Sequence, residues 1–249
     1  MRAADTLAAL ATLGAVGAIG YLLVPALSGT GEARSQGDPA EAAGAVSLAQ
    51  EASPPVPQSN GSGLPEPAEG WIEQASVRTG VPPQAVRSYA RAALAVPREC
   101  GLGWTTVAGI GWVESHHGTI GGRVLGVDGR SDSLVVGPAL DGEGDVAAIR
   151  ATAAGTALHG DATWERAVGP MQFLPSTWEQ WRADGDGDGD EDPGDLDDAS
   201  LAAARYLCHA GGDLRTVSGW SAAVRAYNHS DAYVRAVNAT ANAYAQPAG

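Results

Sequence analysis

After residue 69 the chain carries apolar residues at three- and four-residue spacing, the pattern of helices that bury one face. The first such segment is followed by Gly80, and the second is opened by Pro82 and Pro83 and followed by Pro97. Proline suits the first turn of a helix, where no backbone hydrogen bond is lost, and glycine suits the position just past the end. The pattern therefore predicts two helices between residues 69 and 97.

A third helix is predicted to end within the stretch GIGWVESHHG, residues 109–118. We expect the hydroxyl of Thr105 or Thr106 to cap its start, because a threonine side chain can accept a hydrogen bond from a free backbone N–H there. Gly118 is the expected stop. The apolar stripe of this helix is formed by Val107, Ile110 and Val113 or Trp112.

Glu114 is the carboxylate within this apolar stretch, and it follows Val113 directly, so it borders the apolar stripe. A carboxyl group packed against Trp112 and aliphatic side chains loses hydration, which raises its pKa. An acid that stays protonated near neutral pH can act as a general acid. The alternative is an ordinary surface glutamate near a helix end.

Residues 121–169 lose helical periodicity and are rich in glycine and aspartate, which predicts irregular loops with a small β-element. Short strands are expected at 123–127 and 134–136. Helical spacing returns afterwards, at residues 175–182, from a cap at Asp197 or Asp198 to Gly211, around 220–227 and after a cap at Ser230. The predicted fold class is therefore mainly α with a small β-element.

The charge balance bears on partners. The chain has 249 residues and a formal net charge of −14, and its basic residues are all arginine. A strongly acidic chain is repelled by phosphate backbones and by anionic lipid surfaces. We therefore expect no nucleic-acid partner.

Residues 6–27 form an almost uninterrupted apolar run. The run is long enough to span a bilayer and longer than most signal-peptide cores. Residues 1–27 are therefore predicted to be an N-terminal signal or anchor helix, which would export the protein and hold it to the membrane if uncleaved. A buried core helix is the less favoured alternative, because a segment of low apolar content follows.

Residues 28–68 are rich in proline, glycine and alanine and cannot bury much apolar surface, so they are predicted to be a disordered linker. The linker would hold the folded part away from a membrane. Residues 69–249 then form one compact domain, which is large enough for a single core.

The two cysteines, Cys100 and Cys208, each lie at the end of a predicted helix. In an exported chain an even count predicts a disulfide between them. Neither has the spacing of a metal site. A reactive thiol would need a paired base, and His209 adjoins Cys208 only in sequence.

The stretch DGDGDGDEDP, residues 184–193, matches the first half of an EF-hand-like calcium loop. Carboxylates would come from Asp184, Asp186 and Asp188 at positions one, three and five of the loop. Gly189 stands at position six, where the chain turns sharply, and Asp190 would offer its backbone carbonyl. Without a cation these acids repel one another, and a solvated acidic loop is the alternative.

The last calcium ligand is open between two residues. Asp195 stands at position twelve, where such loops usually carry a bidentate glutamate. Asp198, at position fifteen, would close a longer loop. We prefer Asp198, because the loop must receive its last ligand from the incoming helix.

Three motifs in order resemble those of the bacterial lytic murein transglycosylases. They are VESHHG at 113–118, GPMQFLPSTW at 169–178 and AYN at 226–228. With the calcium loop after the second motif, the chain looks like the membrane-bound B type, or SLT-domain-2 family. The resemblance covers roughly residues 70–245 and implies a lysozyme-like transglycosylase domain.

The resemblance implies roles for five residues. Glu114 corresponds to the family's catalytic acid and base, and Ser115 to a serine that hydrogen-bonds near the reacting sugar. Gln172 corresponds to a substrate-contacting glutamine, and Tyr227 and Asn228 to a tyrosine–asparagine pair at the cleft. Tyr227 could equally be a core tyrosine whose hydroxyl is satisfied.

Other residues of the motifs are expected to be structural. Met171, Phe173 and Trp178 should pack in the core of a small helical domain. His116 and His117 look like loop-facing residues, since a zinc site would need further histidines or cysteines in register.

The implied reaction cleaves the β-1,4 bond from N-acetylmuramic acid to N-acetylglucosamine in peptidoglycan glycan strands. Protonated Glu114 would donate to the leaving oxygen and then take the proton of the muramoyl C6 hydroxyl, which attacks C1. The product is a 1,6-anhydromuramoyl end. Ordinary glycosidases use two carboxylates, whereas no second acid stands near Glu114 in the sequence.

Two alternatives remain open. A hydrolytic muramidase would share the fold and recruit a loop aspartate: Asp128, Asp132, Asp141, Asp145 or Asp161. A non-catalytic, calcium-dependent wall-binding module would keep the fold without the reaction. Under each hypothesis we expect a monomer that works outside the cytoplasm, in the cell envelope.

Overall fold

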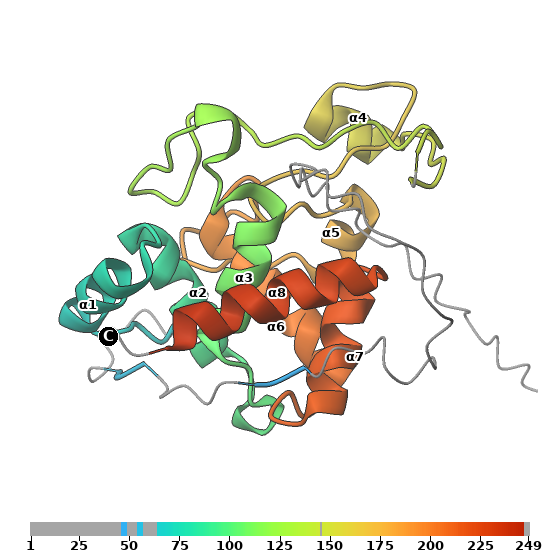
Figure 1. The fold of residues 1–249 in the computed structure, drawn as a ribbon. Coiled ribbons are helices and arrows are strands. Elements are labelled where there is room, and N and C mark those ends of the chain that lie inside the picture. The colour runs from blue at the N-terminus through green and yellow to red at the C-terminus, as the bar shows by residue number, and fades with distance from the viewer. Residues whose placement is uncertain (1–45, 49–53, 57–63, 145, 247–249) are drawn as a thin grey trace, which may run out of the picture.

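The computed structural model describes residues 46–48, 54–56, 64–144 and 146–246 (Figure 1). The predicted signal or anchor helix at 1–27 and much of the predicted linker lie outside these ranges. None of the helices within them combines the length and the apolar character that a bilayer crossing requires.

The described part of the chain is mainly helical, as predicted. It contains eight α-helices and two short 3-10 helices, η1 and η2. In chain order the elements are α1 (Glu69–Thr79), α2 (Pro83–Ala95), η1 (Arg98–Cys100), α3 (Trp104–Ser115), η2 (Ile120–Gly122), α4 (Ala153–His159), α5 (Pro175–Trp181), α6 (Leu196–Gly211), α7 (Val217–Tyr227) and α8 (Asp231–Ala245).

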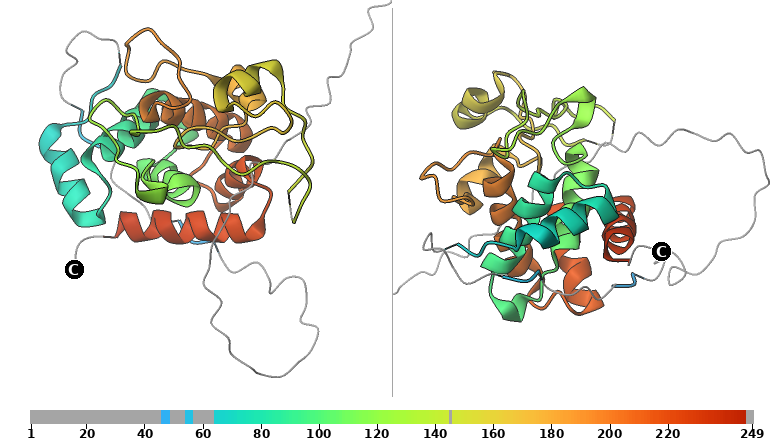
Figure 2. Two further views of the ribbon diagram at one scale, coloured as in Figure 1. Left: turned by 90° about the horizontal axis from the view of Figure 1, so that it is seen from above. Right: turned by 90° about the vertical axis from the view of Figure 1, so that its left-hand side faces the viewer.

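Helix α3 lies at the centre of the helical layers and packs against α2, α6 and α8. Figure 2 shows α8 running along one side of the domain. Its backbone comes so close to α3 that a Cβ on Gly109 would lie 3.0 Å from the carbonyl oxygen of Val237. The core around α3 includes the fully buried side chains of Trp104, Tyr89 and Ile110.

The ends of α3 differ from the prediction. The helix begins at Trp104 with Gly103 as N-cap, and Thr105 and Thr106 are buried inside its first turn. It ends at Ser115, with His116 in the left-handed conformation (φ 52°) rather than Gly118 as the stop. The predicted stop was wrong because the helix already closes at His116 and His117, whose N–H groups donate to the carbonyls of Trp112 and Gly111.

The start of α6 also differs. Asp195 is the N-cap, because its Oδ1 accepts a hydrogen bond of 2.8 Å from the N–H of Asp197. The prediction of Asp197 or Asp198 was wrong because both side chains are used elsewhere. Asp197 pairs with Arg91 at 2.7 Å, and Asp198 accepts hydrogen bonds from the acidic loop.

The segment before α5 contains a helix that the sequence did not predict. Helix α4 starts at the side chain of Thr152, which accepts from the N–H of Gly155, and stops at Gly160 with φ 78°. The expected strands at 123–127 and 134–136 form only isolated bridges, among them Leu125 with Ser131 and Val136 with Val168. Much of the chain between α3 and α5, including α4, lies above these two helices in Figure 1.

The predicted disulfide is confirmed. Cys100 at the end of η1 is bonded to Cys208 in α6, with Cα atoms 5.4 Å apart and a sequence separation of 108. The bond therefore ties the segment between α2 and α3 to the C-terminal half of the domain.

Contacts with the helical domain begin before residue 69. The backbone carbonyl of Ser47 accepts hydrogen bonds from the side-chain amides of Asn238, at 3.0 Å, and Asn242, at 2.6 Å. Glu66 forms ion pairs with Arg87 and Arg91 of α2. These parts of the predicted linker thus lie on the surface of the domain.

Candidate active site

Glu114 lies in the last turn of α3 and is buried, with 8% of its surface exposed. The hydroxyl of Tyr233, on α8, donates a hydrogen bond of 2.6 Å to its Oε1. Burial raises the pKa of Glu114 to about 8, and the bond from Tyr233 opposes that rise. The predicted direction of the pKa shift is confirmed, so Glu114 keeps its proton at neutral pH.

Trp112, the residue expected to shield Glu114 from water, does not cover it. Trp112 is 41% exposed and stacks on the ring of His116, with centroids 4.2 Å apart. Since an α-helix turns about 100° per residue, side chains two positions apart point in nearly opposite directions. The prediction that Trp112 covers Glu114 was therefore wrong, and Glu114 faces α8 instead.

The turn at Gly169–Phe173 is attached to its surroundings through three successive carbonyl oxygens. The carbonyl of Gly169 accepts from Nε2 of Gln172 at 2.8 Å, and that of Pro170 from the hydroxyl of Ser115 at 2.6 Å. The carbonyl of Met171 accepts from the hydroxyl of Tyr227 at 2.7 Å. Three of the residues singled out from the sequence therefore meet at this turn, one from the turn itself and one each from α3 and α7.

Ser115 and Tyr227 are both committed to the protein backbone. Ser115 is fully buried, and its hydroxyl also accepts a hydrogen bond of 2.7 Å from the N–H of Gly118. Burial raises the pKa of the Tyr227 phenol well above its ordinary value, and the nearby charge of Glu114 adds to the effect. Tyr227 therefore lies close to the acid, but its hydroxyl donates to the carbonyl of Met171. This agrees with the alternative in which Tyr227 is a core tyrosine with a satisfied hydroxyl.

Gln172 and Asn228 are buried polar residues on either side of these contacts. Gln172 has φ 49°, a value unusual for a residue with a side chain, and is 8% exposed. Asn228 ends α7, and its Oδ1 accepts a hydrogen bond of 3.0 Å from the N–H of Ser230. As expected, Met171, Phe173 and Trp178 are buried in the core.

The aspartates considered as a second acid are engaged in their own loops. Hydrogen bonds from the backbone of Thr163 and Trp164, and from Arg166, lower the pKa of Asp161 to about 2. Asp128 and Asp141 accept from N–H groups two residues further on, and Asp132 is exposed. Asp145 lies outside the described residues. Within the described part of the chain, no carboxylate contributes to the pKa shift of Glu114.

Two residues near Glu114, Tyr233 and His117, make contacts that the sequence did not predict. Tyr233 was expected only on the inner face of the last helix, yet its hydroxyl touches the acid. His117 was expected to face a loop, yet it is 2% exposed and lies between Tyr89 and Tyr244. A signal for Tyr233 exists, because a buried tyrosine hydroxyl needs a partner, but the sequence does not say which.

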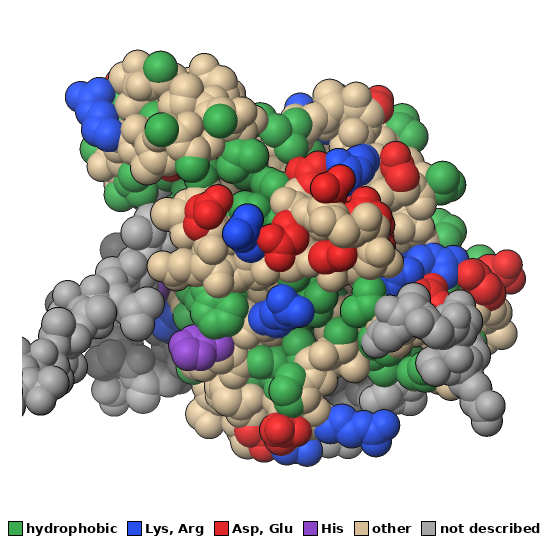
Figure 3. Space-filling model, turned by 180° about the vertical axis from the view of Figure 1, so that it is seen from behind, with side chains coloured by type: hydrophobic (Ala, Val, Ile, Leu, Met, Phe, Trp, Pro, Cys, Tyr) green, Lys and Arg blue, Asp and Glu red, His purple; other side chains and the backbone are tan. Residues whose placement is uncertain are grey.

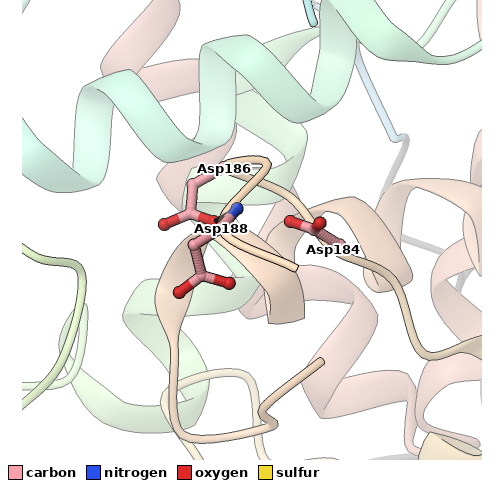
Figure 4. A group of neighbouring side chains, drawn as sticks. All are labelled: Asp184, Asp186 and Asp188. Atoms are coloured by element: carbon pink, nitrogen blue, oxygen red, sulfur yellow. Dashed lines mark hydrogen bonds between the residues drawn. The ribbon is translucent and has the colours of Figure 1, made fainter. Parts of the chain in front are cut away.

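The carboxylates of Asp184, Asp186 and Asp188 gather at the acidic loop, with ligand oxygens within 4.8 Å of one another (Figure 4). Figure 3, seen from behind, shows acidic side chains crowded on one face with arginines beside them. Hydrogen bonds from the N–H groups of Gly187 and Gly189 hold Asp184. A negatively charged donor set made of oxygen atoms alone fits Ca²⁺.

The two candidates for the last ligand point to different partners. Asp195 caps α6 and lies 3.3 Å from Nε of Arg130. Asp198 turns both oxygens to the acidic loop, where they accept from the N–H groups of Gly185 at 2.6 Å and Asp192 at 2.8 Å. Burial raises the pKa of Asp198 to about 6, and the charges of nearby loop aspartates contribute to the rise.

A groove of about 850 Å³ lies near the start of α3, away from Glu114. Gly103, Thr105 and Thr106 line it, together with Leu48 and Pro54 from the N-terminal segment. Glu114 stands in the last turn of the same helix, and a helix rises about 1.5 Å per residue. The groove and the buried acid therefore lie about 12 Å apart along α3, and Glu114 does not line the groove.

Part of the chain matches a known protein family. Residues 147–221 match the family model for the transglycosylase SLT domain. The match includes the Gly169–Phe173 turn, the acidic loop and α6, whereas Glu114 and Tyr233 lie outside it. No curated protein and no solved structure matches the chain. The match supports the likeness to lytic transglycosylases and the lysozyme-like character of the helical fold.

Proposed function

We propose that this protein is a lytic transglycosylase of the membrane-bound B type that acts on peptidoglycan glycan strands. Its substrate would be the β-1,4 bond from N-acetylmuramic acid to N-acetylglucosamine, and its product a 1,6-anhydromuramoyl end. The observation that carries the proposal is the buried acid Glu114, whose pKa burial raises to about 8. The match of residues 147–221 to a transglycosylase domain supports it independently.

Glu114 would act twice in the reaction. As a protonated acid it gives its proton to the leaving glycosidic oxygen, which needs a group that is still protonated near pH 7. As a carboxylate it then takes the proton of the C6 hydroxyl while that oxygen bonds to C1. The C6 proton replaces the one that left on the released hydroxyl as the old bond at C1 breaks, so Glu114 ends the cycle protonated, as it began.

Tyr233 would decide which carboxyl oxygen does this work. Its hydroxyl occupies Oε1 of Glu114 at 2.6 Å, which leaves Oε2 for the transferable proton. The same hydrogen bond stabilises the carboxylate and keeps the pKa from rising further. A single acid that changes protonation state needs such a partner, because a buried bare carboxylate is costly.

The hydrogen bonds to the carbonyls of the Gly169–Phe173 turn would hold the substrate-facing residues in place. Ser115 and Tyr227 bind the carbonyls of Pro170 and Met171, so their part is to fix the turn against Glu114. The proposed sugar contacts are Gln172, which adopts a positive φ within this turn, and Asn228, next to Tyr227.

We further propose that the acidic loop binds a structural Ca²⁺. Asp184, Asp186 and Asp188 would supply carboxylates and Asp190 a backbone carbonyl, with Asp198 as the last acidic ligand. The orientation of Asp198 toward the loop favours it over Asp195, which pairs with Arg130. The ion would neutralise the loop in front of α6 and takes no part in bond cleavage.

The proposed setting is the cell envelope, outside the cytoplasm. A disulfide persists in oxidising compartments, which agrees with export. A membrane attachment through residues 1–27 would hold the enzyme near its polymer, and we expect it to act as a monomer.

Digestion of purified peptidoglycan followed by mass spectrometry tests the reaction. Anhydromuramoyl ends are expected, and reducing ends would indicate a hydrolytic muramidase instead. Glu114→Gln should lose about 10²- to 10⁴-fold in rate, the usual contribution of a general acid. Glu179→Gln, an exposed glutamate on α5, is the matched control and should cleave normally. Strand binding without cleavage by the wild-type protein would support a wall-binding module.

A further inference from the structure

We propose that His117 is a positioning residue which, through Tyr89 and Tyr244, holds α8 where Tyr233 meets Glu114. This inference rests on the proposed function, because it concerns the orientation of the proposed acid. His117 lies three residues after Glu114 and follows the C-cap residue of α3, His116. Neither the family match nor the reaction assigns it a part.

The imidazole of His117 is bridged between two helices. Its Nδ1 lies 2.9 Å from the hydroxyl of Tyr89 on α2, and its Nε2 lies 3.1 Å from the hydroxyl of Tyr244 on α8. The ring is almost fully buried. Since a neutral imidazole has one donor and one acceptor nitrogen, one tyrosine donates to it and the other accepts from it.

The backbone of His117 is fixed as well. Its N–H donates a hydrogen bond of 2.9 Å to the carbonyl of Gly111, and its φ of 61° lies in the left-handed region. A non-glycine residue holds this conformation only where the surroundings determine it. The side chain is therefore directed across the end of α3 toward α8 instead of into a loop.

Helix α8 presents two tyrosines to the end of α3. Tyr233 and Tyr244 are eleven residues apart, close to three full turns, so they share one face of α8. Tyr233 binds Glu114 and Tyr244 binds His117. Two hydrogen bonds three turns apart thus fix both the position and the direction of α8 on α3.

The glycines of α3 make this arrangement tight. A Cβ on Gly109 would crowd the backbone of α8 at Val237, between the two tyrosines. A Cβ on Gly111 would lie 2.1 Å from the hydroxyl of Tyr89, so this hydroxyl rests directly on α3. With so little free space, loss of one hydrogen bond is transmitted as a shift of α8.

The imidazole works without a charge. Burial lowers the pKa of His117 to about 3, and the neighbouring His116 contributes. The groups that face it are the phenols of Tyr89 and Tyr244, whose pKa values burial raises, and the indole of Trp112. His117 therefore stays neutral at working pH and acts by geometry, which separates its part from that of Glu114.

The experiment uses the full chain with Tyr244→Phe and His117→Ala. Tyr244→Phe removes one end of the bridge and His117→Ala removes both of its hydrogen bonds, while Glu114, Tyr233 and Tyr227 are unchanged. Tyr206→Phe is the matched control, because it also deletes a partly buried tyrosine hydroxyl, one that donates to the carbonyl of Ala226. His117→Gln, whose amide can donate and accept hydrogen bonds, should keep part of the bridge and therefore show a smaller change than His117→Ala.

Two readouts decide the matter. The first is the carboxyl ¹³C titration of Glu114 by NMR, which needs no activity. Both bridge variants should move its midpoint upward, because the weakened Tyr233 bond no longer favours the carboxylate. The second is kcat against pH, where we expect a loss on the order of tenfold to hundredfold with KM nearly unchanged.

An unchanged Glu114 titration in folded Tyr244→Phe would overturn the proposal, as would an equal shift in Tyr206→Phe. Should the wild-type protein not cleave peptidoglycan, the titration would still test the bridge, so the two proposals fail separately.

Discussion

Tyr233 donates its hydroxyl proton to Oε1 of Glu114 across a separation of 119 residues. One residue belongs to the last helix and the other to the third. The contact exists only because α8 packs against α3. The proposed acid is therefore completed by a helix that lies far from it in the sequence.

The pH dependence of activity should follow Glu114. Its pKa is raised to about 8, so the proton needed for the first step is present below that pH and is lost as the pH rises through it. We expect kcat to fall on the alkaline side with a midpoint near 8. Steady-state rates on glycan strands between pH 5 and 10 check this, and a rate that is flat across pH 8 would contradict it.

The stability of the fold should depend on pH through the same group. The folded pKa of Glu114 lies above the unfolded value, about 4.3 for glutamate, so folding binds a proton in between. The contribution is full below the unfolded pKa and is lost as the pH rises through about 8. At roughly 1.4 kcal/mol per pKa unit, the loss amounts to a few kcal/mol.

Glu114→Gln should remove the part of this dependence that Glu114 contributes, because glutamine has no proton to lose, and the smaller part due to Asp195 and Asp198, whose pKa values burial raises to about 7 and about 6, should remain. Urea unfolding at pH 5 and pH 9 measures it: the variant should be the more stable protein at pH 9. Glu179→Gln should keep the wild-type slope. If Glu114→Gln retains that slope, the carboxyl group does not carry it.

Tyr233→Phe should raise the pKa of Glu114 further, because the hydrogen bond it deletes favours the carboxylate. The alkaline limb of the rate profile should move to higher pH, with kcat near pH 7 lower on the order of tenfold because a weaker acid gives its proton to the leaving oxygen less readily. Stability should fall by about 1 kcal/mol. Tyr206→Phe should show a similar loss of stability with an unshifted profile, which separates the two effects.

Removal of divalent cations should destabilise the protein. The acids of the loop repel one another unless a cation is bound, and ligand bound at a hundredfold above its Kd adds about 2.7 kcal/mol. Chelation should therefore lower the melting temperature, and added Ca²⁺ should restore it. Asp186→Asn should weaken this response, whereas Asp132→Asn, an exposed loop aspartate, should not. A melting curve indifferent to both chelator and Ca²⁺ would reject the site.

Loss of the disulfide should also destabilise the fold. The bond closes a loop between residues 108 apart, which the chain-entropy description values at on the order of 4 kcal/mol. Denaturant unfolding with and without reductant measures this. The double variant Cys100→Ser with Cys208→Ser should be as weak as the reduced protein and insensitive to reductant.

Much of the architecture follows from local pattern. Pro83 at the start of α2, Gly80 after α1 and Ser230 before α8 stand where the sequence predicted a start or a stop, because proline, glycine and serine act there through their own backbone and hydroxyl. The buried state of Glu114 was also foreseen, since its position beside the apolar stripe is fixed by helical spacing.

Where side chains compete for partners, local pattern was insufficient. Asp195, Asp197 and Asp198 are all plausible caps for α6, and only the distant Arg91 and the neighbouring acidic loop decide which carboxylate is left for the helix. The short helix α4 was missed for a related reason, because a single turn or two has too few positions to show a period.

The sequence by itself determined every described α-helix except α4, the disulfide pair, the acidic loop and the identity of the buried acid. These follow from residue types and spacings within one segment, or from a pairing that admits one solution. Tertiary structure alone decided that Tyr233 touches Glu114, that Ser115 and Tyr227 serve the Gly169–Phe173 turn, and that His117 bridges two helices. Such contacts join residues far apart in the chain, and only the packing of α8, α7 and α2 around α3 brings their atoms within hydrogen-bonding distance.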